Sequence, residues 1–85
     1  MSAVAEMMTC QVSYLALATD EFETETEKIL DVIRDSGLEH HIGTLATEIR
    51  GHKAELLALI EKLVNVAEGE SRYVLDVRLS NTCGC

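Results

Sequence analysis

Two hydrophobic periods alternate along the chain, and their order is what most restricts its fold. Side chains that alternate between apolar and polar predict strands over residues 9–18, 45–50 and 72–80, and a short polar stretch at 38–42 suits a sheet edge. Apolar residues at helical spacing predict one helix after Thr19 or Asp20 and another over residues 53–67. In 85 residues this order predicts a single α+β, ferredoxin-like βαββαβ domain, with a four-stranded antiparallel sheet and two helices on one face.

Local signals mark the ends of the first helix and the buried side of both helices. Thr19 or Asp20 offers a capping oxygen, and Gly37 supplies the left-handed residue that ends the helix. Its acidic residues match the positive end of the helix dipole, so they need no catalytic role. The predicted buried stripe of this helix is Phe22, Thr26, Ile29, Leu30 and Ile33. The second helix is predicted to bury Leu56, Leu59, Ile60, Leu63 and Ala67, with Leu57 and Val64 widening that face.

Strand alternation divides the other side chains between the two faces of the sheet. The face toward the helices is predicted to carry Val12, Tyr14, Ala16, Leu45, Thr47, Ile49, Tyr73, Leu75, Val77 and Leu79. The opposite face carries Gln11, Ser13, Leu15, Leu17, Ala46, Glu48, Arg50, Val74, Asp76 and Arg78. Around Leu15 and Leu17 this second face is too apolar to face water. We therefore expect a second subunit to cover it or to extend the sheet, giving a homodimer or homotetramer.

Composition excludes several classes of protein. The formal net charge is −8 and no basic stripe is present, which argues against nucleic-acid binding. No apolar run approaches the roughly 20 residues that cross a bilayer, and residues 1–8 lack the features of a secretory signal. We expect a cytoplasmic protein without membrane insertion. One domain over residues 1–85 is predicted, with 1–8 and 82–85 frayed.

Cysteine and histidine offer a weaker, metal-handling alternative. Cys10 lies within a strand pattern and is predicted to be a small buried hydrophobe. His40 and His41 are adjacent, so on a strand their rings point to opposite faces and cannot chelate one ion together. The residues that remain for a metal site are one of these histidines, His52, Cys83 and Cys85. A structural zinc site requires four ligands, so we expect no metal and no cofactor.

Three segments resemble one known family. Residues 10–17 (CQVSYLAL), 46–51 (ATEIRG) and 77–81 (VRLSN) look like one repeat of the thiamine-binding, YkoF-related proteins. The resemblance implies a ferredoxin-like fold, assembly into dimers or tetramers, and recognition of thiamine through its hydroxymethylpyrimidine part, without catalysis. The chain departs from the family at Leu15 and Ala16, where a tyrosine or isoleucine followed by proline is usual.

Hydroxyl groups on the inward face supply the main candidates for a ligand site. Tyr14, Thr47 and Tyr73 interrupt otherwise aliphatic positions, and a buried hydroxyl either bonds locally or meets a ligand. The resemblance favours Tyr14 and Thr47, in a slot between sheet and helices that the last strand also lines. The other candidates are the polar strand residues Gln11 and Ser13, the strand-terminal Asn81, and Glu48. For Glu48 an ion pair with Arg50 or Arg78 is the preferred interpretation.

These observations predict a binding protein and not an enzyme. No Ser-His-Asp or Cys-His arrangement, phosphate loop or nucleotide motif is present. The leading hypothesis is a non-catalytic protein for thiamine or its hydroxymethylpyrimidine part, acting in vitamin transport or salvage. An oligomeric regulatory or structural module that binds another metabolite is the alternative. A phosphate ester would need a basic patch, for which the plausible sources are Arg50, Arg72 and Arg78.

Overall fold

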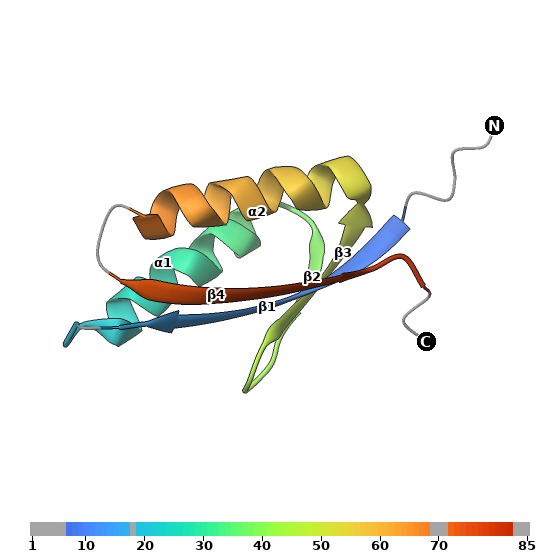
Figure 1. Cartoon of the computed structure of the whole chain (residues 1–85). Helices are drawn as coiled ribbons and strands as arrows, with labels where there is room; N and C mark the ends of the chain where they lie inside the picture. Colours follow the sequence, from blue (N-terminus) through green and yellow to red (C-terminus); the bar gives the residue numbers. More distant parts are fainter. Residues whose placement is uncertain (1–6, 18, 69–71, 83–85) are drawn as a thin grey trace.

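Two helices lie on one face of a four-stranded antiparallel sheet, as the sequence predicts (Figure 1). The computed structural model describes residues 7–17, 19–68 and 72–82. The sheet has the strand order β2-β3-β1-β4, so β1 is central and both β2 and β4 are edges. The elements are β1 (Met7–Ala16), α1 (Phe22–Asp35), β2 (Glu39–Ile42), β3 (Thr47–His52), α2 (Lys53–Glu68) and β4 (Tyr73–Ser80). This arrangement confirms the ferredoxin-like fold.

The structure describes only part of the two terminal segments that were predicted to fray. Met7 and Met8 already pair with His52 and Gly51 of β3, so the sheet begins two residues earlier than alternation indicates. Residues 1–6 and 83–85 lie outside the described residues, and so do Ala18 and residues 69–71. No helix in the described part of the chain has the length and apolar character needed to cross a membrane.

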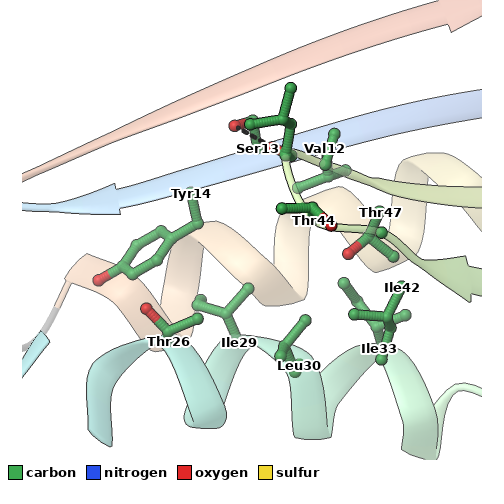
Figure 2. Close-up of a pocket in the computed structure, with 13 residues that line it drawn as sticks. Val12, Ser13, Tyr14, Thr26, Ile29, Leu30, Ile33, Ile42, Thr44 and Thr47 are labelled. Carbon is green, nitrogen blue, oxygen red and sulfur yellow. Dashed lines mark hydrogen bonds between the residues drawn. The ribbon is translucent and has the colours of Figure 1, made fainter. Parts of the chain in front are cut away.

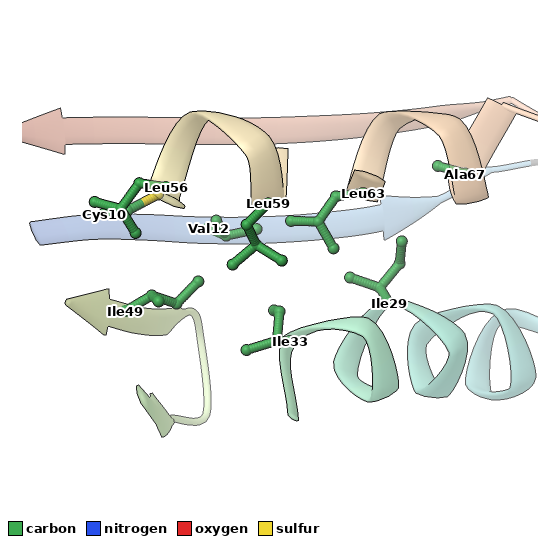
Figure 3. Close-up of a cluster of buried hydrophobic side chains, with 9 residues drawn as sticks. All are labelled: Cys10, Val12, Ile29, Ile33, Ile49, Leu56, Leu59, Leu63 and Ala67. Carbon is green, nitrogen blue, oxygen red and sulfur yellow. The ribbon is translucent and has the colours of Figure 1, made fainter. Parts of the chain in front are cut away.

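The hydrophobic core fills the layer between the sheet and both helices (Figure 3). Burying one valine, leucine or isoleucine side chain contributes about 1.5–3 kcal/mol to the free energy of folding. The buried side chains of this layer therefore hold the helices to the sheet. Cys10 belongs to the core as predicted, and its burial raises the pKa of its thiol. The buried residues are Cys10, Val12, Ile29, Ile33, Ile49, Leu56, Leu59, Leu63 and Ala67.

The two ends of α1 differ in how local bonds hold them. Glu21 is the N-cap and no side chain caps the helix there, so the cap predicted at Thr19 or Asp20 is wrong; the Thr19 hydroxyl instead accepts a hydrogen bond from the backbone N–H of Glu21 at 3.0 Å. At the other end Ser36 Oγ donates to the carbonyl oxygen of Ile33 at 2.6 Å. Gly37 then adopts a φ of 77°, the left-handed conformation that the sequence predicts for this position.

The buried stripe of α1 differs from the prediction in its first turn. Phe22 is 56% exposed, because it is the first helical residue and lies before α1 passes over the sheet. Glu25 is buried in its place, one turn before Ile29. Its carboxylate lies 3.4 Å from Lys28 Nζ, and this pairing offsets part of the cost of removing the charge from water.

Three other residues that were predicted to face inward are exposed, although two of them do point to the helix side. Leu45 is 88% exposed because β3 begins only at Thr47, which leaves Leu45 in the turn after β2. Val77 and Leu79 point to the helix side, in register with Val12 and Cys10, yet they are exposed. The reason is the strand order: α1 and α2 pack over β1 and β3, whereas β4 is an edge strand.

Leu63 and Leu57 of α2 allow a matched test of the core. Leu63 is buried, whereas Leu57, which was predicted to widen the apolar face, is exposed. We expect Leu63→Ala to lower the free energy of unfolding by about 2–5 kcal/mol, since it leaves a cavity. Leu57→Ala should change it by less than about 1 kcal/mol. Urea unfolding followed by circular dichroism measures both, and equal losses would contradict the described core.

Candidate functional site

A pocket with a volume of about 130 Å³ opens between α1, the middle of β1 and the turn that joins β2 to β3 (Figure 2). Its aliphatic wall comes largely from one side of α1, where Ile29, Leu30 and Ile33 recur at helical spacing. Val12 of β1 and Ile42 of β2 complete that wall. The pocket is therefore a part of the interlayer space that the core side chains leave unfilled.

Thr47 places a hydroxyl inside this pocket. It is the first residue of β3, it pairs with Val12 on the helix-facing side of the sheet, and it is only 5% exposed. Among the described residues its hydroxyl has no hydrogen-bond partner in the protein. Figure 2 shows its oxygen directed toward the space above Leu30. No fully buried side-chain nitrogen or oxygen of the described residues lacks a partner, so the Thr47 hydroxyl oxygen reaches the open space of the pocket, where water or a ligand can bond to it.

Tyr14 and Thr26 form the other end of the pocket. Tyr14 comes from β1, and its ring stacks on that of Tyr73 with centroids 6.0 Å apart and an angle of 29° between the rings. Thr26 faces it from α1, with its hydroxyl oxygen toward Tyr14 in Figure 2. Because a hydroxyl both donates and accepts, Thr26 at this end and Thr47 at the other can bond to either kind of polar atom.

The turn between β2 and β3 forms the remaining wall and is held by two hydrogen bonds. The N–H of Gly43 donates to the carbonyl of Ala46 at 2.9 Å, and Ser13 Oγ donates to the carbonyl of Leu45 at 3.2 Å. A side chain at position 43 would meet the Ala46 oxygen at 2.9 Å, so glycine is needed for this turn to close. Ser13 therefore links β1 to the turn across the pocket edge.

The size of the pocket limits what it can hold. A cavity of about 150 Å³ is enough for one benzene molecule, whereas sites for drug-sized ligands measure roughly 300–1,000 Å³. The 130 Å³ here is close to the volume of the benzene cavity and well below that of a drug-sized site. Anything attached to a ring in this pocket must project through the open side. The lining contains aliphatic, hydroxyl and backbone groups and no charged side chain.

The pocket gathers only half of the six residues proposed from sequence. Tyr14, Thr47 and Ser13 line it. Gln11 and Glu48 are cross-strand partners on the opposite face of the sheet, and Asn81 is exposed beyond the end of β4. No residue of β4 lines the pocket, so the predicted contribution of the last strand is wrong.

The predicted ion pair of Glu48 is also absent, since within the described ranges this exposed carboxylate contacts neither Arg50 nor Arg78. On the same open face a wider polar hollow of about 450 Å³ is lined in part by Gln11, Ser13, Asp76 and Arg78. The side chains of Gln11, Asp76 and Arg78 there are exposed, so this hollow offers a ligand no buried polar group.

Sequence reasoning missed Thr26 and the whole of the turn. Thr26 was assigned to the buried stripe but not to a site, although a hydroxyl among aliphatic residues could have marked it. Thr44 gave no signal, because turn composition explains a threonine equally well. Thr44 lines the pocket only because the turn lies beside α1, and the tertiary structure alone determines that position.

The histidines are placed as predicted. His40 is paired with Ile49 and His41 with Glu48, so their side chains leave the sheet on opposite faces. His40 Nδ1 lies 2.9 Å from the carbonyl oxygen of Leu38. Over the described residues, no three His, Cys, Asp or Glu side chains group as metal ligands would. Cys83 and Cys85 lie outside the described residues.

Solved structures of proteins from several bacteria have a fold similar to that of this chain. A Streptococcus pneumoniae protein matches with a TM-score of 0.81 at 13% identity, over 87% of this chain and 84% of that one. A Thermotoga maritima protein with a provisional assignment to thiamine biosynthesis or salvage matches with a TM-score of 0.78 at 16% identity, over 86% and 81%. A domain of unknown function, DUF77, from Bacillus cereus matches with a TM-score of 0.78 at 17% identity, over 88% and 75%.

At these identities the likeness shows the fold. No protein-family model matches the chain, and no curated protein matches it in sequence. The structural neighbours thus include a DUF77 domain and a protein provisionally linked to thiamine, each at low sequence identity.

Removing the hydroxyl of Thr47, and that of Ser36 for comparison, tests whether Thr47 lacks a hydrogen-bond partner. We expect Thr47→Val to leave the free energy of unfolding unchanged or to raise it by up to about 1 kcal/mol, because no hydrogen bond is lost. Ser36→Ala is the control, since Ser36 Oγ donates to Ile33 and accepts from the N–H of Leu38 at 3.1 Å. It should cost about 1 kcal/mol. A loss for Thr47→Val as large as that for Ser36→Ala in urea titrations would show that Thr47 is bonded.

Proposed function

We propose that this protein is a non-catalytic binding protein for a small heteroaromatic ring, and that its ligand is thiamine or the hydroxymethylpyrimidine part of thiamine. The observation that carries the proposal is the unpartnered hydroxyl of Thr47, 5% exposed, in a pocket of about 130 Å³. A pocket for one ring with a few fixed polar groups is the usual design of a small-ligand site.

The aminopyrimidine ring of thiamine matches this pocket in size and in chemistry. It is flat, six-membered and carries donors and acceptors on its edge, which the hydroxyls of Thr26 and Thr47 can meet from opposite sides. The thiazolium ring, with its fixed positive charge, would then stay outside at the open side. A protein with a net charge of −8 attracts such a cation over long range.

Two further observations support thiamine among the possible rings. Residues 10–17, 46–51 and 77–81 resemble the YkoF-related thiamine-binding family, and we propose membership of that family. One of the structural neighbours has a provisional assignment to thiamine biosynthesis or salvage. A cytoplasmic role in transport or salvage of the vitamin follows from the same proposal.

The chemistry of the lining supports binding without catalysis. A threonine, serine or tyrosine hydroxyl becomes a nucleophile only when a base beside it accepts its proton. Among the residues that the structure describes, no histidine, cysteine or carboxylate lines the pocket. The proposed protein therefore holds its ligand unchanged, and we assign it no cofactor.

The open face of the sheet supports a second copy as partner. Leu15 is 58% exposed there, its cross-strand partner Val74 is exposed, and Leu17 follows on the same side. Soluble monomers seldom expose contiguous apolar side chains of this kind. We propose that two copies pack through this face into a homodimer, with a homotetramer as the larger alternative, and that the pocket on the helix side remains accessible.

Isothermal titration with thiamine and with free hydroxymethylpyrimidine tests the proposed ligand. We expect one ligand per chain, and an affinity about three- to tenfold lower in Thr47→Val, because one hydrogen bond to the ring is lost. Thr26→Val should weaken binding similarly. Thr24→Val, at an exposed position of α1 outside the pocket, is the matched control and should bind like the unaltered protein. Folded protein that gives no heat with either compound would refute thiamine as the ligand.

A further inference from the structure

The pocket offers nothing that could neutralise an anion, and this restricts the chemical form of its ligand. We infer that the site selects the unphosphorylated ring compound and rejects the same ring carrying a phosphate ester. The inference rests on the proposed function and deepens it. The protein would then bind the free vitamin or its free pyrimidine precursor. That form exists before a kinase adds phosphate to the compound or after a phosphatase removes the phosphate.

None of the lysine and arginine side chains of the protein lines the pocket. The chain contains seven, all of them in the described part. Arg50 and Arg78 lie on the open face, on the far side of the sheet, where they are cross-strand partners of Thr9 and Gln11. Lys53 and Lys62 belong to α2, and Arg72 precedes β4. The three arginines that were candidates for a phosphate site are therefore placed outside it.

Arg34 is the basic residue next to the pocket wall in sequence, and it is already engaged. Its Nη1 donates to Asp31 Oδ1 at 2.9 Å and to Glu27 Oε1 at 3.2 Å. Hydrogen bonds to these two carboxylates, Glu27 first, raise the pKa of Arg34. The two carboxylates thus balance the charge of this guanidinium on the exposed side of α1. Lys28 is likewise held beside Glu25 at 3.4 Å.

The backbone N–H groups of the α1 residues that line the pocket, which could otherwise hold a phosphate, are committed to the helix. Thr26 and the wall residues beyond it lie past the first turn of α1, where N–H groups serve the helix itself, as when Glu25 donates to Glu21 at 3.0 Å. In the turn, the N–H of Gly43 donates to Ala46. A phosphate projecting from the open side would therefore find neither a free helical N–H group nor a lysine or arginine side chain on the wall formed by α1.

Acidic side chains add a repulsive contribution. Glu23 and Glu27 are exposed on α1 on either side of Thr26 in sequence, and the chain as a whole carries −8. A phosphate ester carries about −1.5 to −2 at neutral pH. Long-range repulsion and the absence of a cation thus act in the same direction, whereas a neutral pyrimidine or a thiazolium cation meets neither penalty.

The sharpest probes are hydroxymethylpyrimidine and its monophosphate, because they share one ring and differ only in the phosphate. Titration calorimetry of the intact protein should give an affinity at least about tenfold lower for the monophosphate. Equal affinities would overturn the selection while leaving the proposed function in place. If neither compound nor thiamine binds, the proposed function fails, and this inference fails with it.

A variant that supplies the missing cation gives the complementary test. Thr44 is exposed at the pocket edge, so Thr44→Lys places an ammonium group at the open side. We expect the ratio of the two affinities to shift at least about threefold toward the monophosphate. Asn65→Lys, on the exposed surface of α2, makes the same change in net charge and is the control. An unchanged ratio in Thr44→Lys, or an equal shift in Asn65→Lys, would contradict the inference.

Discussion

The register of β1 between β3 and β4 is the constraint on which the rest of the structure depends. As the central strand it pairs antiparallel with both neighbours, and its alternation sends Cys10 and Val12 into the core. Tyr14 continues the same row into the pocket. A shift of one residue would exchange the faces of the strand and turn these side chains toward the open side. Core and pocket are thus consecutive stretches of one strand face.

This continuity explains how so small a domain can contain a pocket beside its core. The interlayer space is filled by aliphatic side chains where α2 crosses β1 and β3, and it is left open where α1 meets the turn after β2. Large side chains that could have closed the opening, Leu45 and Phe22, are exposed instead. The hydroxyl of Thr47 then lacks a partner in the described protein. Because no fully buried side-chain oxygen of the described residues lacks a partner, this hydroxyl reaches the pocket and can bond to water or to a ligand.

Much of the fold could be predicted because periodicity is a local property. The order of elements, the left-handed Gly37 and the inward positions of Val12 and Ile49 follow from alternation and helical spacing alone. The errors share one cause, which is that local patterns do not reveal what lies opposite. Val77 points to the predicted face but lies on an edge strand and is exposed, and Leu45 lies two residues before β3 begins. Likewise the opposite-face candidates Gln11 and Glu48 were polar for reasons unrelated to the pocket.

By itself the sequence determined the βαββαβ order, which residues share a strand face, and that Tyr14 and Thr47 bring hydroxyls to the inner side. These are consequences of the two-residue and 3.6-residue periods of the backbone. Tertiary structure alone decided that Thr26 and the turn around Thr44 meet those hydroxyls, that the opening admits one ring, and that every arginine and lysine lies outside it. Such facts depend on how far apart the layers pack and on where each edge ends, and no local pattern along the chain encodes those distances.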